Sequence, residues 1–150
     1  EFNARFGDPE AMNVLTLLQN GFLEVCQGVA DGRLSGDVPF LRKATVCKYV
    51  VPAGYGTEPK AGLPVTVDER RLEGTGARLY YAAVDERDGV VLTTSSRTLG
   101  VVGMADSIEE AEEVCEAGLA HVHGDVFVRH DIGKGELVRR RVEHMRQVRG

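Results

Sequence analysis

The hydrophobic and polar positions of this 150-residue chain follow two different patterns, one on each side of a polar loop at residues 31–39. Before the loop, apolar residues recur at helical spacing and predict two short helices, the second running from Phe22 to about Ala30. The run Asp8-Pro9-Glu10 is typical of a helix start, with Asp as N-cap, Pro at the first helical position and Glu in the first turn. In residues 1–5 polar and apolar side chains alternate instead, which predicts a strand.

After the loop, short β-rich runs bounded by turn residues predict an antiparallel β region. Strands are expected at residues 45–51, 78–84, 90–93, 98–104 and 125–129. The dipeptide Asp88-Gly89, between the second and third of these, predicts a hairpin turn. Ser107 and Glu110 form a capping box that opens an amphipathic helix ending near His121, and a last helix begins near Glu136. The pattern therefore predicts an α+β fold, with one long helix packed on short antiparallel strands.

The composition is sufficient for a packed core, because 43% of the residues are hydrophobic. A net charge of −5 gives no general case for nucleic-acid binding, and the basic residues of segment 134–150 are interpreted as the solvated face of a terminal helix. No apolar run is long enough for a membrane span. The three cysteines form no C-x-x-C pair, so we expect reduced core thiols in a cytoplasmic protein.

The strand predicted at residues 1–5 carries three polar side chains on one face. Glu1 and Asn3 offer a carboxylate and an amide oxygen, which are ligands that Mg²⁺ prefers. Arg5 beside them offers a planar fork for a phosphate or an acyl phosphate. The E-x-N-x-R spacing also occurs on many solvated sheet faces, so the spacing alone leaves both interpretations open.

Residues 1–12, EFNARFGDPEAM, resemble the signature of the phosphoribosylamine–glycine ligase family, a member of the ATP-grasp superfamily. The family pattern is R-F-G-D-P-E, one free position, then Gln or Met, and residues 5–12 satisfy it. Three further stretches are similar to family motifs: Gly54-Tyr55 to a glycine-tyrosine turn, TSSRTL at 94–99 to T-N-G-G-R-V-L, and RHDIG at 129–133 to R-K-D-I-G, with His130 in place of Lys. The resemblance extends from residue 1 to about residue 133.

This resemblance implies that the chain is the C-terminal portion of a longer ligase. Residues 1–40 would be the C-terminal segment of the ATP-grasp domain, with its last strand and helices. Residues 41–150 would be a small β-rich C-terminal domain of barrel-sandwich-hybrid type with a packed helix. The 150 residues contain neither G-x-x-x-x-G-K-[ST] nor G-x-G-x-x-G, the glycine-rich loops that cradle phosphates. We therefore expect the isolated chain to be inactive.

The resemblance also implies a reaction of de novo purine biosynthesis, in which ATP, glycine and 5-phosphoribosylamine give glycinamide ribonucleotide through a glycyl phosphate. Glu1 and Asn3 would bind Mg²⁺ or Mn²⁺, with ATP as co-substrate. Arg5 would be catalytic and stabilise the acyl phosphate or the transferred phosphoryl group. Asp8 and Glu10 would face the amine-bearing substrate. The expected partners are these three substrates and the remainder of the ligase chain, with no nucleic acid and no membrane.

Two other functions stay open. The chain alone could be a non-catalytic module that packs against the ATP-grasp core. It could also belong to a carboxylase-type relative that shares the E-x-N-x-R strand, although R-F-G-D-P-E favours the glycine ligase. Residues 95–97, Ser-Ser-Arg, are candidates for contact with a phosphate. Structural rather than catalytic roles are expected of two polar pairs, His121 with His123 and His130 with Asp131.

Overall fold

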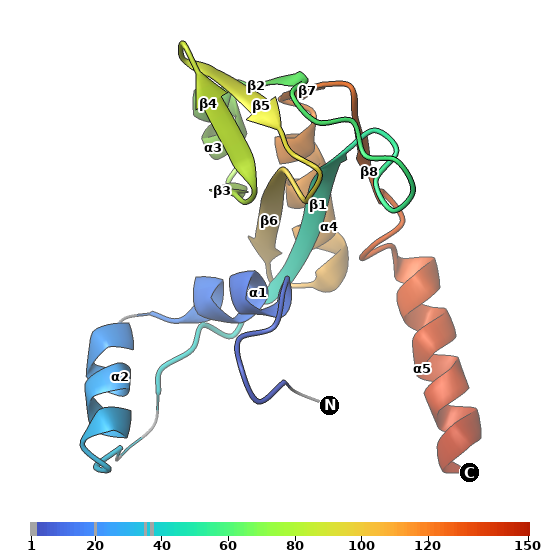
Figure 1. Ribbon diagram of the computed structural model, residues 1–150. Coiled ribbons are helices and arrows are strands. Elements are labelled where there is room, and N and C mark those ends of the chain that lie inside the picture. Colours follow the sequence, from blue (N-terminus) through green and yellow to red (C-terminus); the bar gives the residue numbers. More distant parts are fainter. Residues whose placement is uncertain (1–2, 20, 35, 37) are drawn as a thin grey trace.

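The computed structural model describes residues 3–19, 21–34, 36 and 38–150. Its elements are, in chain order, α1 (Glu10–Leu17), α2 (Phe22–Ala30), β1 (Ala44–Pro52), β2 (Pro64–Val67), α3 (Glu69–Gly74), β3 (Arg78–Tyr81), β4 (Val84–Arg87), β5 (Val90–Thr93), β6 (Leu99–Ala105), α4 (Ile108–Leu119), β7 (Val122–Gly124), β8 (Val126–Val128) and α5 (Gly135–Arg149). Within these residues the strands form two four-stranded antiparallel sheets, in the orders β3-β6-β1-β8 and β4-β5-β2-β7. The fold class is therefore α+β, as predicted (Figure 1).

The first sheet is covered by α4 on one face and by α1 on the other. Successive side chains of β1 point to opposite faces, so Lys48 meets α4, whereas Tyr49 lies with Gly100 against Met12 of α1. A Cβ at Gly103 would collide with the backbone of α4, so glycine at this position lets α4 lie directly on β6. Burial on both faces explains why β1 reads as a nearly continuous apolar run.

The core lies where β1 and β6 of the first sheet, β2 of the second, α3 and α4 meet. Its buried residues are Val46, Val50, Val65, Leu72, Ala77, Leu99, Val101, Ala111, Cys115 and Leu119. We call residues 44–134 the β body. Burial raises the pKa of the Cys115 thiol to about 11, so this cysteine is an inert core residue.

Several predicted elements are confirmed. The second helix has the predicted ends, Phe22 and Ala30, and the strands predicted at 45–51 and 98–104 correspond to β1 and β6. The capping box is present as well: Ser107 Oγ accepts from the Glu110 N–H at 3.2 Å, and the Ser107 N–H donates to the Glu110 carboxylate at 3.1 Å.

Other predictions were wrong in part. The strand expected at 78–84 is two strands, because the chain passes at Ala82-Ala83 from the first sheet to the second. The hairpin at Asp88-Gly89 therefore joins β4 to β5, and both of its turn residues have positive φ, 52° and 76°. Residues 3–5 form no strand, since no described strand lies beside them to accept their backbone hydrogen bonds. The sequence did not reveal β2, α3 or β7.

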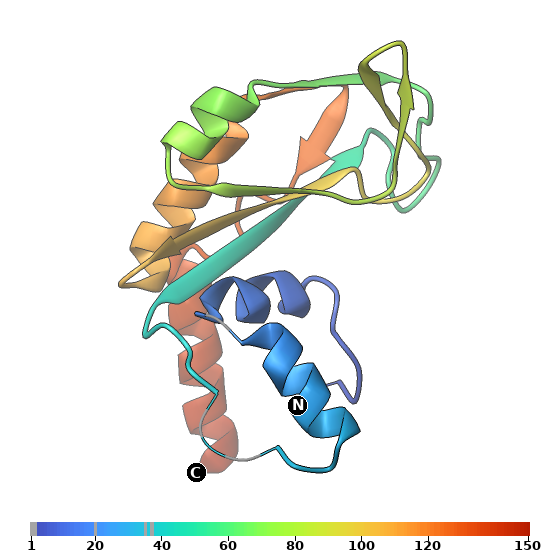
Figure 2. The same cartoon turned by 90° about the vertical axis from the view of Figure 1, so that its left-hand side faces the viewer.

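Two helical regions project from the β body toward the same end of the molecule (Figures 1 and 2). We call residues 3–19 and 21–34, which contain α1 and α2, the N-terminal arm. The expectation that all three cysteines are core residues is wrong for Cys26, which is exposed because it lies on α2, where no residue is buried. The second projecting region is α5. In the described part of the chain, no helix has the length and apolar character needed to cross a membrane.

Candidate functional site

Polar residues predicted for the site meet in one small cavity at the start of α1. Its volume is about 210 Å³, and its wall includes Asn3, Arg5 and Glu10. The rest of the wall is Phe6, Gly7, Ala11, Val14 and Leu15. Glu1, the predicted carboxylate ligand, lies outside the described residues. The sequence therefore identified three side chains that share a cavity, although it placed Asn3 and Arg5 on a strand that does not form at residues 3–5. Glu10 lies in the first turn of α1, as predicted.

Gly7 is what allows the polar side chains to lie so close together. A Cβ at this position would collide with the Glu10 carboxylate and would stand 3.0 Å from Asn3 Nδ2. Arg5 donates one N–H to the Phe6 carbonyl at 2.8 Å, which leaves most of its guanidinium donors for other acceptors. The cavity thus combines an amide, a carboxylate and a fixed cation.

Asp8 is not the N-cap of α1, contrary to the helix-start prediction. The cap residue is Pro9, without a side-chain hydrogen bond. The Asp8 carboxylate accepts instead from the Tyr49 hydroxyl and, at 2.9 Å, from Arg97 Nη1. The pKa of Tyr49 is raised above its usual range, mainly by burial and secondly by the hydrogen bond to Asp8.

Arg97 connects the N-terminal arm to the β body. Its guanidinium carbon lies 5.0 Å from the centroid of the Tyr49 ring, close enough for a cation–π contact, while it pairs with Asp8. Local sequence signals could not reveal this arrangement, because Tyr49 and Arg97 are 41 and 89 residues away from Asp8. The hypothesis that residues 95–97 contact a phosphate stays a prediction.

The oxygen donors of the cavity suit a hard cation. Asn3, the predicted ligand that the structure describes, supplies an amide oxygen to the wall, a ligand type of Mg²⁺ and Mn²⁺, and the Glu10 carboxylate lies in the same wall. In the described residues, no three His, Cys, Asp or Glu side chains form a metal-binding group. A hard cation that binds Asn3 would take further ligands from water or phosphate oxygens.

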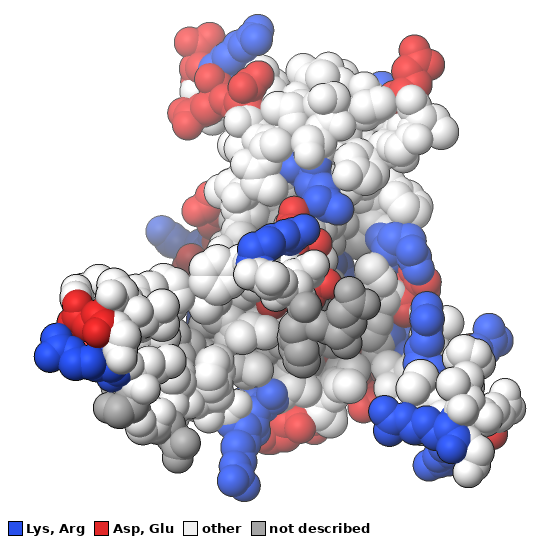
Figure 3. Space-filling view, turned by 60° about the horizontal axis from the view of Figure 1, so that its bottom comes forward, with Lys and Arg blue, Asp and Glu red and all other residues white. Residues whose placement is uncertain are grey.

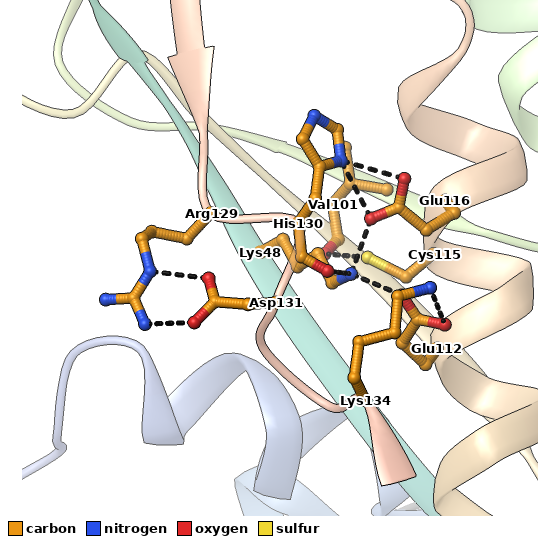
Figure 4. Close-up of polar contacts among 9 residues, drawn as sticks. All are labelled: Lys48, Val101, Glu112, Cys115, Glu116, Arg129, His130, Asp131 and Lys134. Atoms are coloured by element: carbon orange, nitrogen blue, oxygen red, sulfur yellow. Dashed lines mark hydrogen bonds and ion pairs between the residues drawn. The ribbon is translucent and has the colours of Figure 1, made fainter. Parts of the chain in front are cut away.

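A second polar centre, which the sequence did not suggest, lies between β1 and α4 (Figure 4). Lys48 is completely buried, and its Nζ donates to Glu112 and Glu116 at 2.5 Å each and to the His130 carbonyl at 3.0 Å. Lys134 reaches Glu112 from the other side at 2.7 Å. We call these five residues the lysine cluster.

The lysine cluster holds its carboxylates in the charged form. Burial alone would raise the pKa of Glu112 and of Glu116, but hydrogen bonds from the surrounding cations hold both below the usual value. His130 Nδ1 lies 2.9 Å from the Glu116 carboxylate, and Asp131 pairs with Arg129 at 2.5 Å. Both side chains thus have hydrogen-bond partners within the chain, and the expectation of a structural rather than catalytic role for them stays a prediction.

Comparison with known proteins identifies the family. Residues 45–135 match the sequence profile of the family described as phosphoribosylglycinamide synthetase, C domain. Over 99% of its length the chain is 53% identical to the phosphoribosylamine–glycine ligase of Methanocaldococcus jannaschii, and over its full length it is 54% identical to that of Methanocella arvoryzae. It also resembles the crystal structure of phosphoribosylamine–glycine ligase from Thermotoga maritima, with a TM-score of 0.72 and 27% identity over 87% of this chain and 32% of that one.

These matches define the class of the protein as a phosphoribosylglycinamide synthetase C domain. The chain belongs to the phosphoribosylamine–glycine ligase family, as its sequence motifs had indicated. It spans about a third, 34%, of the length of the curated relatives it matches.

Proposed function

We propose that this chain supplies the C-terminal third of an ATP-dependent ligase that joins glycine to 5-phosphoribosylamine. The observation that carries the proposal is the cavity shared by Asn3, Arg5 and Glu10, all from the stretch that resembles the ligase signature. The names of the relatives support a glycine ligase over a carboxylase-type enzyme. A cytoplasmic location belongs to the proposal and is supported by three free thiols.

In this proposal, residues 1–40 complete the active site of an ATP-grasp domain. Residues 41–150 form a C domain of barrel-sandwich-hybrid type, which the two antiparallel sheets support. The exposed apolar side chains of α2, Phe22 and Leu23 among them, would then be covered by the preceding part of the ligase. The alternative is a non-catalytic module that packs against the rest of the ligase. The same exposed side chains would serve that role, and an inactive cavity would favour it.

Each polar residue at the start of the chain has a proposed role. Asn3, together with Glu1, would hold Mg²⁺ or Mn²⁺, which when bound offsets the charge of the phosphates. Arg5 would donate N–H groups to the transferred phosphoryl group or to the glycyl phosphate. Glu10 would face the amine of phosphoribosylamine. Asp8 would lie beside the same substrate, with its carboxylate oriented by side chains of the β body.

Steady-state kinetics of the full-length ligase test this proposal. Arg5→Gln removes the guanidinium while keeping a polar side chain, and we expect kcat to fall by about 100-fold or more. Arg42→Gln is the matched control, since Arg42 is exposed and does not line the cavity. A full-length protein without glycine-dependent ADP formation would contradict the ligase function, and an unchanged kcat for Arg5→Gln would contradict the role of Arg5.

A further inference from the structure

The terminal helix α5 is amphipathic, but its apolar side is uncovered in the described part of the chain. None of its residues is buried. Val138, Val142, Met145 and Val148 lie along one side of the helix at spacings of three and four residues. Val142 is 46% exposed, Met145 44% and Val148 66%. A repeated apolar stripe of this kind marks a surface that binds another surface.

The β body fixes α5 at its base. Lys134, directly before the helix, pairs with Glu112, whose side chain is only 5% exposed and is also bonded to the buried Lys48 (Figure 4). Gly133 has a φ of +83° and packs so closely that a Cβ there would lie 2.9 Å from Val46. Because the base is anchored in this way, α5 projects from the β body in a defined direction (Figure 1).

The charge of α5 indicates the kind of surface that it fits. Residues 134–150 contain six Lys or Arg and two Glu, which gives 6 − 2 = +4, whereas residues 1–133 contain twelve Lys or Arg and 21 Asp or Glu, which gives −9. Basic side chains gather over this helix in the space-filling view (Figure 3). On the apolar side, a hollow of about 640 Å³ is lined by Val142 and Met145 together with Arg141, Arg146 and Arg149, so basic side chains border the apolar surface.

We propose that α5 docks on an acidic face of the upstream part of the ligase. That upstream part then lies between α5 and the N-terminal arm. This inference rests on the proposed function. The curated relatives are about three times as long as this chain, which leaves about two-thirds of a ligase to cover the helix. The N-terminal arm, whose α2 exposes Leu23 and Phe22, extends toward the same end of the molecule as α5 (Figure 2). Pairing of α5 with its copy in a second chain is disfavoured, since each carries +4.

Hydrogen exchange and thermal unfolding of the full-length ligase test the docking. Met145→Asp and Gln147→Asp each place one carboxylate on the same turn, but the two positions are about 200° apart around the helix. We expect the α5 amides of the unaltered ligase to exchange slowly. Met145→Asp should speed their exchange at least tenfold and lower the unfolding midpoint, whereas Gln147→Asp should change neither.

Three results would overturn the inference: equal effects of the two variants, rapid exchange of α5 in the unaltered ligase, or a dimer that Met145→Asp converts to monomers. The last would mean that a second copy covers the stripe. Glycine-dependent ADP formation is measured on the same samples. An active ligase with rapidly exchanging α5 contradicts the docking alone, whereas an inactive ligase with protected α5 contradicts the catalytic function and supports the docking.

Discussion

The β body buries its large apolar side chains, whereas the N-terminal arm leaves many of its own exposed. Leu72, Leu99 and Val101 in the β body are fully buried, whereas Leu23 on α2 is 76% exposed and α2 has no buried residue. The β body contains its own packing partners, two sheets and the capped helix α4. The arm carries the motif residues, but α1 and Asp8 make its contacts with the β body, whereas α2 has no buried residue. The more chemically specialised region is thus the less self-sufficient one.

The largest effect is expected on activity. If the arm needs an outside partner, the 150-residue chain alone should form no glycine-dependent ADP, because it cannot position ATP against its cavity. Loss of proximity and orientation removes about 7–11 kcal/mol of catalytic advantage. A coupled ADP assay with the full-length ligase as positive control measures this, and turnover by the isolated chain would show that the arm forms a complete site.

The next effect tests the β body. Lys48→Met leaves two carboxylates without their buried cation, and we expect the free energy of unfolding to fall by about 3–5 kcal/mol. Lys43→Met is the control, since Lys43 pairs with Asp106 at the surface and such pairs contribute less than about 1 kcal/mol. Chemical denaturation of both variants at pH 7 gives the comparison. Equal losses would show that the lysine cluster does not hold the β body together.

The same cluster predicts a pH dependence. The folded pKa values of Glu112 and Glu116 lie below the ordinary 4.5, so the unfolded state binds protons more readily. The stability they contribute is present above about pH 4.5 and is lost as the pH falls through the folded values. Denaturation curves between pH 7 and pH 3 should show this loss in the unaltered chain and a smaller one in Lys48→Met. Parallel curves would contradict the assignment.

A pair of leucine truncations sharpens the comparison directly. Leu72→Ala removes a completely buried side chain from the β body and should cost about 2–5 kcal/mol. Leu23→Ala removes an exposed one and should change the stability of the 150-residue chain by no more than about 0.5 kcal/mol. In the full-length ligase, however, Leu23→Ala should become destabilising. An unchanged stability there would mean that no upstream surface covers α2.

The sequence predicted best where the signal is local. The capping box of Ser107 and Glu110 fixes the start of α4, and Asp31-Gly32 ends α2, so both elements could be placed from neighbouring residues. The change of sheet at Ala82-Ala83 was missed, because it depends on which strands lie alongside. Short elements such as α3 and β2 have too few residues to show a period.

The candidate site shows the same division. The motif residues Asn3, Arg5 and Glu10 could be selected from sequence, and the structure brings them to one cavity. The partners of Asp8 could not, since they come from distant strands and loops. Lys48 was equally hidden, because an isolated lysine within an apolar strand gives no indication of the carboxylates that α4 will place beside it.

The smallest effect concerns the contact that joins the two regions. Asp8 and Arg97 are 52% and 39% exposed, so solvent screens their attraction, and a pair of this kind contributes about 0.2–1 kcal/mol. We expect Asp8→Asn and Arg97→Gln to show a coupling energy of this size in a double-mutant cycle on the 150-residue chain.

Although small, the coupling should act only on the arm. Either variant should speed amide exchange in α1 and leave exchange in β1 and β6 unchanged, because the β body has its own core. Thr57→Ala, which removes a hydroxyl bonded to Gly54 within a loop of the β body, serves as a control that should leave α1 exchange unaltered. Faster exchange in β1 as well as in α1 would mean that the arm and the β body unfold together, and the contrast between the two regions would then be one of exposure rather than of stability.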